Sequence, residues 1–329
     1  MRFGFAALLP ALAALTLGAC ASGQAASGGR NPLAGQAFYV EPNGIAAQQV
    51  SEWRETDQGK DAGVLERVST QPVAAWFTGE ADVEREIRGL TAKAASAGRS
   101  ALLVAYDIPG RDCGAFSKGG ASSARGYRRW IEAFAAGIGG ARATVVLEPD
   151  ALAQTLSRCL PAGLAAQRYE LLAFAVGVLR KQRSTSVYID AGNPGWVHDL
   201  RRLAAALKRS GIGGANGFAL NVSNFYRVPT VTGYGTRLSR LVGGKHFVID
   251  TSRDGNGPDT AAADAPDWCN PPGRALGPNP TTKTGISLVD AFLWVKQPGS
   301  SDGSCRPGEP RAGQWWPNYA LELAENAGG

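Results

Sequence analysis

Carboxylate side chains recur directly after short apolar segments of this chain of 329 residues. These are Asp112, Asp150, Asp190, Asp250 and Asp302. Pairs of carboxylates that face one cleft perform general acid and general base catalysis, and glycoside hydrolysis is the leading example. The two histidines, His198 and His246, lie in no recognisable motif, so a Ser-His-Asp triad and a histidine metal site are not supported. The sequence therefore predicts a carboxylate enzyme, for which we expect neither a metal nor a cofactor.

The segment from Tyr106 to Gly120 places one of these carboxylates beside a guanidinium and a cysteine. It follows the apolar run 101–105, which is typical of a buried strand, and Pro109 with Gly110 ends that strand. Arg111, Asp112 and Cys113 follow at once. Taken alone, the segment could equally be a turn with a surface ion pair. Several other predicted strands end in similar residues, which favours a functional site.

Apolar patterns predict seven strands, most of them separated by a helix. The predicted strands are 73–77, 101–106, 143–147, 186–189, 217–220, 246–249 and 289–295, with helices at 81–97, 127–138, from 151 onward, 171–179 and 200–207. Alternating strands and helices indicate an α/β fold with a parallel sheet, in a single domain. In a β/α barrel the carboxyl ends of the strands carry the active site. Two long segments, 253–288 and 297–318, show no regular pattern, and loops of this length are typical of lids and cleft walls.

Composition restricts the classes of protein to which the chain could belong. Hydrophobic residues make up 44% and charged residues 19%, which is typical of a globular protein with an ample core. The net charge is +6, but lysines and arginines form no run. We interpret this net charge as a contribution to solubility, and we expect no nucleic-acid partner.

The N-terminus resembles an export signal. Arg2 precedes an apolar segment, 3–17, that is too short to span a membrane. The sequence Leu17-Gly18-Ala19-Cys20 resembles a bacterial lipobox, so we predict a signal peptide at 1–19, then a lipidation site at Cys20 and a flexible tether at 20–34. The catalytic domain would occupy 35–329. The protein would then be exported as a cell-surface lipoprotein, and ordinary secretion is the alternative.

The remaining four cysteines favour disulfides. An even number of cysteines in an exported chain indicates two bonds, and three pairings are open. We choose the sequential pairing, Cys113 with Cys159 and Cys269 with Cys305. Zinc is the other use of four cysteines, but no C-x-x-C pair is present.

Tryptophans in the predicted loops point to a sugar substrate. An indole can stack on the apolar face of a pyranose, and Trp76, Trp196 and Trp268 lie where a core position is harder to argue. Hydrophobic packing is the alternative for each ring.

Taken together, these segments resemble the glycoside hydrolase family 6 cellulases, also called cellulase family B. The resemblance rests on Tyr106–Cys113 (Y-x-x-P-x-R-D-C), Val146–Asp150 (V-L-E-P-D), Tyr188–Gly192 (Y-I-D-A-G), Asn221–Asn224, Asp250–Pro258 (D-T-S-R-D-G-N-G-P), Trp268-Cys269 and Ala291–Asp302. It implies a distorted seven-stranded β/α barrel and an enzyme that cuts β-1,4-glucan with inversion at the anomeric carbon.

The resemblance also implies roles for individual residues. Asp150 would be the general acid, Asp112 would keep it protonated and organise the attacking water, and Asp302 matches the position usually proposed as base. Tyr106 would lie under the distorted sugar, and Arg111 would hold Asp112 ionised. Substrate contacts would come from Trp76, Thr78, Asp190, Asn193, Trp196, Asn224, Trp268, Lys296 and Ser300. Because Asp150 begins a predicted helix, an N-cap is its alternative role, and a cap would lower its carboxyl pKa whereas a general acid needs a raised one.

Three positions depart from the pattern of the family. The family usually has His at Asn193, Glu at Ser300, and a Ser that helps to hold the catalytic water at Lys118. A glycan-binding protein with little turnover is therefore one alternative, although Asp112 and Asp150 are both retained. An exo-acting cellobiohydrolase is another, but the loops after Asp112 and Asp302 are short for a tunnel roof. We expect an endo-acting, monomeric β-glucan hydrolase.

Overall fold

The structure is a computed structural model that describes residues 1–4, 30–260 and 265–328. The predicted lipidation site at Cys20, and most of the predicted signal segment, lie outside the described residues.

Seven parallel strands form one sheet whose spatial order follows the chain. They are β1 (Ala75–Phe77), β2 (Ala101–Ala105), β3 (Ala143–Leu147), β4 (Thr185–Asp190), β5 (Gly217–Leu220), β6 (His246–Asp250) and β7 (Val289–Leu293). The sheet curls until its edges meet, because Val73 forms a parallel bridge with Trp294 and the Ala74 amide donates to the Trp294 carbonyl at 3.0 Å. The predicted seven-stranded α/β barrel in a single domain is confirmed.

Both faces of β2 to β7 are buried, which is why these strands are predominantly apolar in sequence. Alternate side chains point to opposite sides. On β2, Leu102 and Val104 belong to the cluster inside the barrel, whereas Leu103 and Ala105 belong to the outer cluster under the helices. Because the strands are parallel, the carboxylates that follow them lie at the same rim of the barrel.

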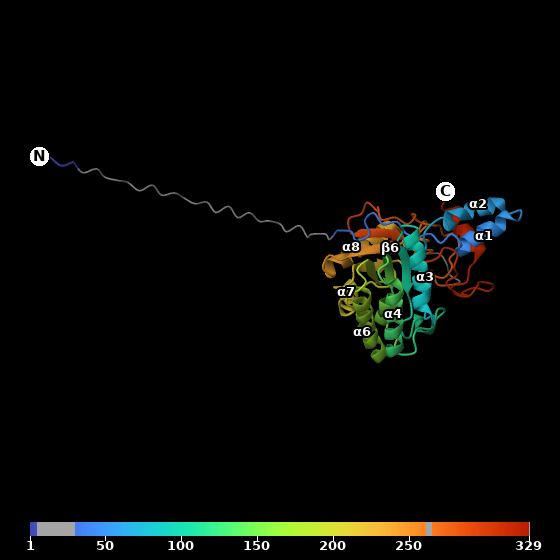
Figure 1. Cartoon of the computed structure of the whole chain (residues 1–329), viewed down its shortest axis with the longest axis horizontal. Coiled ribbons are helices and arrows are strands. Elements are labelled where there is room, and N and C mark those ends of the chain that lie inside the picture. Colours follow the sequence, from blue (N-terminus) through green and yellow to red (C-terminus); the bar gives the residue numbers. More distant parts are fainter. Residues whose placement is uncertain (5–29, 261–264, 329) are drawn as a thin grey trace.

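Helices cover the outside of the sheet, and α3 (Val83–Ser96), α4 (Ala124–Ile138), α6 (Ala162–Leu179) and α7 (Leu200–Arg209) stand side by side (Figure 1). The short α5 (Ala151–Leu156) and α8 (Val228–Leu241) complete this layer. By length and composition α6 could cross a membrane. Because Leu171, Leu172 and Val176 are buried in the outer core cluster, we interpret it as a core helix.

Four helices were not predicted from the sequence. Of these, α1 (Ile45–Arg54), α2 (Gly59–Ser69) and α9 (Pro317–Asn326) pack together through Trp53, Leu65 and Leu323, so the first two helices lie against the C-terminal helix (Figure 1). The fourth, α8, is rich in β-branched residues and glycine, which disfavour a helix. Tertiary packing overrides this propensity: a Cβ at Gly235 would lie 2.5 Å from the Phe247 ring, so only glycine lets α8 approach β6 so closely.

The long loops are joined as the cysteine spacing predicted. Cys113 is bonded to Cys159, which attaches the Asp112 loop to the connection between α5 and α6. Cys269 is bonded to Cys305, which links the two long loops. The predicted sequential pairing is confirmed.

Candidate active site

Asp150 and Asp190 lie together at the carboxyl ends of β3 and β4. The Asp150 amide donates to Asp190 Oδ1 at 3.0 Å. Burial, and then the negative charges of Asp190 and Asp112, raise the pKa of Asp150 well above its ordinary value. Burial also raises the pKa of Asp190, to about 7. Two neighbouring carboxylates, of which Asp190 is buried and Asp150 partly buried, cannot both ionise easily, so Asp150 is suited to carry a proton.

The structure does not support the alternative role of Asp150 as an N-cap. It precedes α5 with a left-handed backbone, φ of 68°, and its side chain makes no capping hydrogen bond. Asp190, which was predicted to contact substrate, also raises the pKa of Asp150, and more than Asp112 does. Positive φ values also occur at Asp112, Asn221 and Ser223, near other strand ends, as is typical of functional sites.

Asp112 is held by the backbone and by a buried polar network. Its Oδ2 accepts from the Ser117 amide at 2.6 Å and its Oδ1 from Gln154 Nε2 at 3.4 Å. Gln154 Oε1 in turn accepts from the buried Arg168, which also donates to the Ala151 carbonyl at 3.1 Å. Sequence reasoning missed Gln154 and Arg168, which lie in helices and carried no motif.

Arg111 does not form the predicted ion pair with Asp112. It donates instead to the carbonyls of Ser117, Thr78 and Tyr106 and lies 4.7 Å from the Tyr106 ring centroid. Burial raises the pKa of Asp112, and the smaller opposing effects of the Ser117 amide and Arg111 do not cancel it. Arg111 therefore positions the loop more than it ionises the carboxylate.

Asp302 has the opposite electrostatic environment. Arg253, fully buried, donates to both carboxylate oxygens at 2.8 and 3.1 Å, and Lys296 Nζ lies 3.0 Å from Oδ1. Burial alone would raise the pKa of Asp302, but these two cations outweigh it and lower the pKa below its ordinary value. The Asn270 amide adds a hydrogen bond at 3.1 Å. The pKa of Asp302 is thus shifted down by its cationic partners, whereas the pKa of Asp150 is shifted up.

Asp250 connects the loops that follow β5, β6 and β7 at the rim that carries Asp150 and Asp302. Its carboxylate accepts from the amides of Ser223, Ser252, Val295 and Lys296 at 2.9 to 3.2 Å, joining the ends of β5, β6 and β7. Sequence reasoning named Asp250 as a carboxylate at a strand end but missed Arg253, whose partner lies 49 residues away.

The aromatic candidates divide into two groups. Tyr106 and Trp76 meet edge to face at 5.2 Å, with the Trp76 indole donating to the Val295 carbonyl at 2.8 Å. Trp196 and Trp268 are exposed by 38% and 40%, and Trp268 lies 6.1 Å from the ring of Phe116. Sequence reasoning did not select Phe116, an exposed aromatic in the Asp112 loop.

The polar substrate-binding candidates lie on the loops that follow the strands. Thr78 is exposed and its hydroxyl donates to Glu80, while Asn193 is buried and its Oδ1 accepts from the Gly195 amide. Asn224 Oδ1 accepts from the adjacent Phe225 amide. Ser300 pairs with Trp315 in an isolated bridge. These contacts are local, and none of them joins its residue to Asp150.

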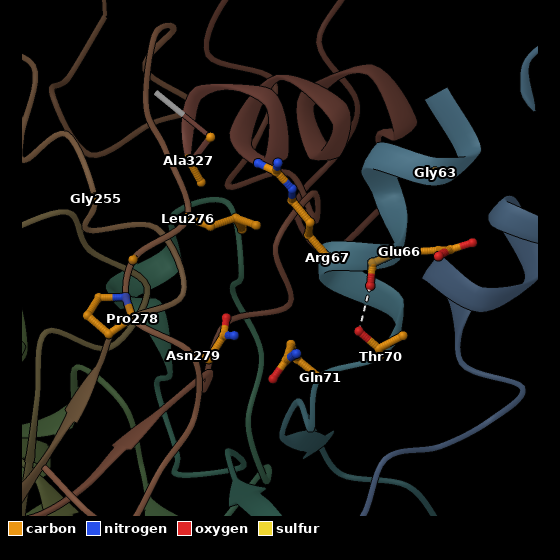
Figure 2. Close-up of a pocket in the computed structure, with 12 residues that line it drawn as sticks. Gly63, Glu66, Arg67, Thr70, Gln71, Gly255, Leu276, Pro278, Asn279 and Ala327 are labelled. Atoms are coloured by element: carbon orange, nitrogen blue, oxygen red, sulfur yellow. Dashed lines mark hydrogen bonds between the residues drawn. The ribbon is translucent and has the colours of Figure 1, made fainter. Parts of the chain in front are cut away.

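A separate groove of 780 Å³ lies outside this region. Figure 2 shows it between α2, the segment around Pro278 and Asn279, and the C-terminal end near Ala327. Its lining includes no aromatic side chain and none of the residues discussed above. It therefore lacks the features of a sugar-cleaving site.

The environment of Asp150 predicts a pH effect. A general acid must be protonated, so activity should fall as pH rises through the pKa of Asp150. Asp190→Asn removes a negative charge that raises this pKa while keeping an oxygen for the Asp150 amide, so the alkaline limb of the kcat/KM profile should move to lower pH. Asp112→Asn should move it less, and Asp199→Asn, in an exposed helix cap, should not move it. An unchanged limb in Asp190→Asn would contradict this coupling.

Comparisons with known proteins agree with this geometry. A family model described as "Glycosyl hydrolases family 6" matches residues 33–327. Endoglucanase A of Cellulomonas fimi is 43% identical over 88% of this chain, which spans 61% of that relative's length. Endoglucanase 1 of Streptomyces halstedii is 36% identical over 96% of this chain and 97% of its own length.

A solved structure extends the similarity to three dimensions. The endoglucanase Cel6 from Mycobacterium tuberculosis, in complex with methyl-cellobiosyl-4-deoxy-4-thio-β-D-cellobioside, superposes with a TM-score of 0.85 at 42% identity. It matches 91% of this chain and all of its own. Since the family model covers almost the whole described domain and the relatives share its sequence and fold, this chain belongs to glycosyl hydrolase family 6.

Proposed function

We propose that this protein is an inverting, endo-acting β-1,4-glucanase that cleaves cellulose or a related β-glucan. The observation that carries the proposal is the contrast between two carboxyls: Asp150 lies beside the carboxylate of Asp190 and has a raised pKa, whereas Asp302 is paired with Arg253 and Lys296 and has a lowered one. An acid and a base with separated pKa values are what glycoside hydrolysis requires.

In this mechanism Asp150 protonates the oxygen of the leaving sugar. Asp302 accepts a proton from the attacking water, and Asp112 orients that water and helps to keep Asp150 protonated. Tyr106 and Trp76 support the distorted sugar at the cleavage point. The exposed rings of Trp196 and Trp268 bind neighbouring sugars, together with Thr78, Asn193, Asn224, Lys296 and Ser300.

Endo action is favoured because the chain is more similar in sequence to relatives named endoglucanases than to those named cellobiohydrolases. Bacterial relatives named endoglucanases are 36–43% identical to this chain, whereas fungal proteins named cellobiohydrolases are 27–32% identical. We expect the viscosity of carboxymethylcellulose to fall much faster than reducing sugar appears. If viscosity falls only in proportion to the reducing sugar released, the result would instead indicate exo action. If neither the viscosity nor the reducing sugar changes, the result would favour a glycan-binding protein.

The stereochemistry of the product tests the assigned roles. An inverting enzyme needs room for water between base and sugar, so its carboxyl groups stand roughly 6.5–9.5 Å apart, against about 5–5.5 Å in a retaining pair. With sugar bound, the separation of Asp150 from Asp302 should lie in or slightly above the inverting range. Proton NMR of a fresh hydrolysate should show the α-anomer first. An initial β-anomer would mean retention and would refute these roles.

We also propose that the protein is exported and anchored by lipid on Cys20. The two disulfides fit an oxidising compartment outside the cytoplasm. Two or more acyl chains anchor a protein stably, whereas one does not. The native protein should therefore enter the detergent phase in phase partitioning, and Cys20→Ala should move it to the aqueous phase. Native protein found wholly in the medium would show free secretion.

A further inference from the structure

The end of the barrel opposite the proposed catalytic rim is predominantly basic, although Glu41 also lies there and pairs with Lys93 at 3.1 Å. Because all seven strands are parallel, the segments that lead into them meet at this end. For β2 to β7 these segments, with the last turn of the helix where one precedes, are 93–100, 135–142, 176–184, 206–216, 238–245 and 283–288. They contain no Asp or Glu, and their basic residues are Lys93, Arg99, Arg142, Arg180, Lys181, Arg183, Lys208, Arg209, Arg240, Lys245 and Lys283. We call this surface the basic face.

Helix dipoles account for only part of this charge. Cations are favoured in the last turn of a helix, where Lys208, Arg209 and Arg240 lie. Arg99, Arg142 and Arg183 lie beyond the helix ends. Some of the basic groups also repel one another. Burial lowers the pKa of Lys245, and the nearby positive charge of Arg180 lowers it further.

A groove of 430 Å³ gathers three of the arginines. Arg142, Arg180 and Arg183 line it, and their guanidinium groups make no ion pair or hydrogen bond with any described residue. Thr185, only 7% exposed, lines the same groove, and its hydroxyl has no partner within the described ranges. Free guanidinium donors around a buried hydroxyl are suited to a phosphate group.

The chain also leaves the domain at this face. Pro32 and Gln36 line the groove, and Leu33 is buried in the cluster inside the barrel. Asn31 Nδ2 donates to the Asp290 carbonyl on β7 at 2.9 Å. The described part of the domain therefore begins, at Arg30, beside the basic face. Cys20 precedes Arg30 by ten residues, a reach of at most about 35 Å when fully extended.

We infer that the basic face docks on an anionic lipid surface, with headgroup phosphates in the arginine groove and the catalytic rim turned away from the membrane. The inference rests on the proposed lipid anchor, which would hold this face near the bilayer. Juxtamembrane cations are attracted to anionic leaflets within a Debye length, so a short tether and a basic face act together. The substrate would then approach from the side away from the membrane.

Vesicle binding by the exported full chain with Cys20→Ala, which lacks the acyl chains, tests the inference. We expect it to bind vesicles that contain phosphatidylglycerol at low salt, but not at high salt and not on phosphatidylcholine alone. Replacing the groove arginines (Arg142→Gln, Arg180→Gln and Arg183→Gln together) should weaken binding by roughly 10- to 100-fold.

A matched control removes the same charge elsewhere. Lys60, Arg125 and Arg129 are exposed and lie on other surfaces, so their combined change to Gln should leave binding close to that of the parent. Equal losses in the two triple variants, or equal binding to neutral vesicles, would overturn the inference. So would binding of soluble polyphosphate without binding of vesicles. Hydrolysis of carboxymethylcellulose should be the same in both variants, so failure of vesicle binding leaves the proposed activity intact.

Discussion

Replacing Asp150 by Asn should cut hydrolysis of unactivated β-glucan by about 10²–10⁴-fold, because the leaving oxygen loses its proton donor. The amide keeps the shape of the side chain but cannot donate an acidic proton. A substrate with a good leaving group, such as an aryl cellobioside, needs little protonation and should lose much less activity. Steady-state kcat/KM on both substrate types measures the difference.

Two controls test whether the loss of activity comes from the missing proton donor at Asp150. Asp199→Asn alters an exposed carboxylate at the start of α7 and should leave both rates unchanged. Thermal unfolding of Asp150→Asn should show a folded protein, since the buried carboxyl is replaced by a neutral group. An equal loss on activated and unactivated substrates would mean that Asp150 is not the general acid.

Replacing Arg253 by Met should lower the free energy of unfolding by roughly 3–5 kcal/mol, because Asp302 would remain a buried charge with one of its two cations removed. Arg253 is fully buried, donates to both Asp302 oxygens and lies 4.3 Å from the Phe225 ring centroid. Activity should fall as well, since the pKa of Asp302 would rise and the proposed base would be less ionised. Chemical denaturation and pH–rate profiles measure the two effects.

A double-mutant cycle measures the interaction energy between Arg253 and Asp302 apart from their contacts with other residues. Asp302→Asn alone leaves Arg253 buried beside a neutral partner, and the double variant should be less destabilised than the sum of the single variants. Arg88→Met removes an exposed partner of Glu84 and should change stability by less than about 0.5 kcal/mol. Additive effects of Arg253→Met and Asp302→Asn would show that the two charges are not coupled.

Local patterns in the sequence identified the strands and the main chemical groups. Buried parallel strands leave runs such as 143–147, and the turn residues after them mark where each run ends. The motifs around Asp112 and Asp150 lie within a few residues of one strand end, so they could be recognised without knowing the fold. The disulfides were predictable because four cysteines in an exported chain leave few pairings. Helices α1, α2 and α9 were missed, and their buried residues pack in one cluster to which all three contribute.

The sequence by itself therefore determined the class of chemistry and the parallel strands, whereas the barrel followed from the family resemblance and the disulfide pairing was a choice among three. The tertiary structure decided which charges meet: Asp190 beside Asp150, Arg253 with Asp302, and arginines from separate loops around one groove. Lysines and arginines that form no run along the chain gather on one face only because parallel strands bring their leading loops together. A pKa depends on burial and on the distance to charges from other strands. Neither quantity is encoded in any short segment, so the opposite pKa shifts of Asp150 and Asp302, and the basic face, became apparent only in the folded protein.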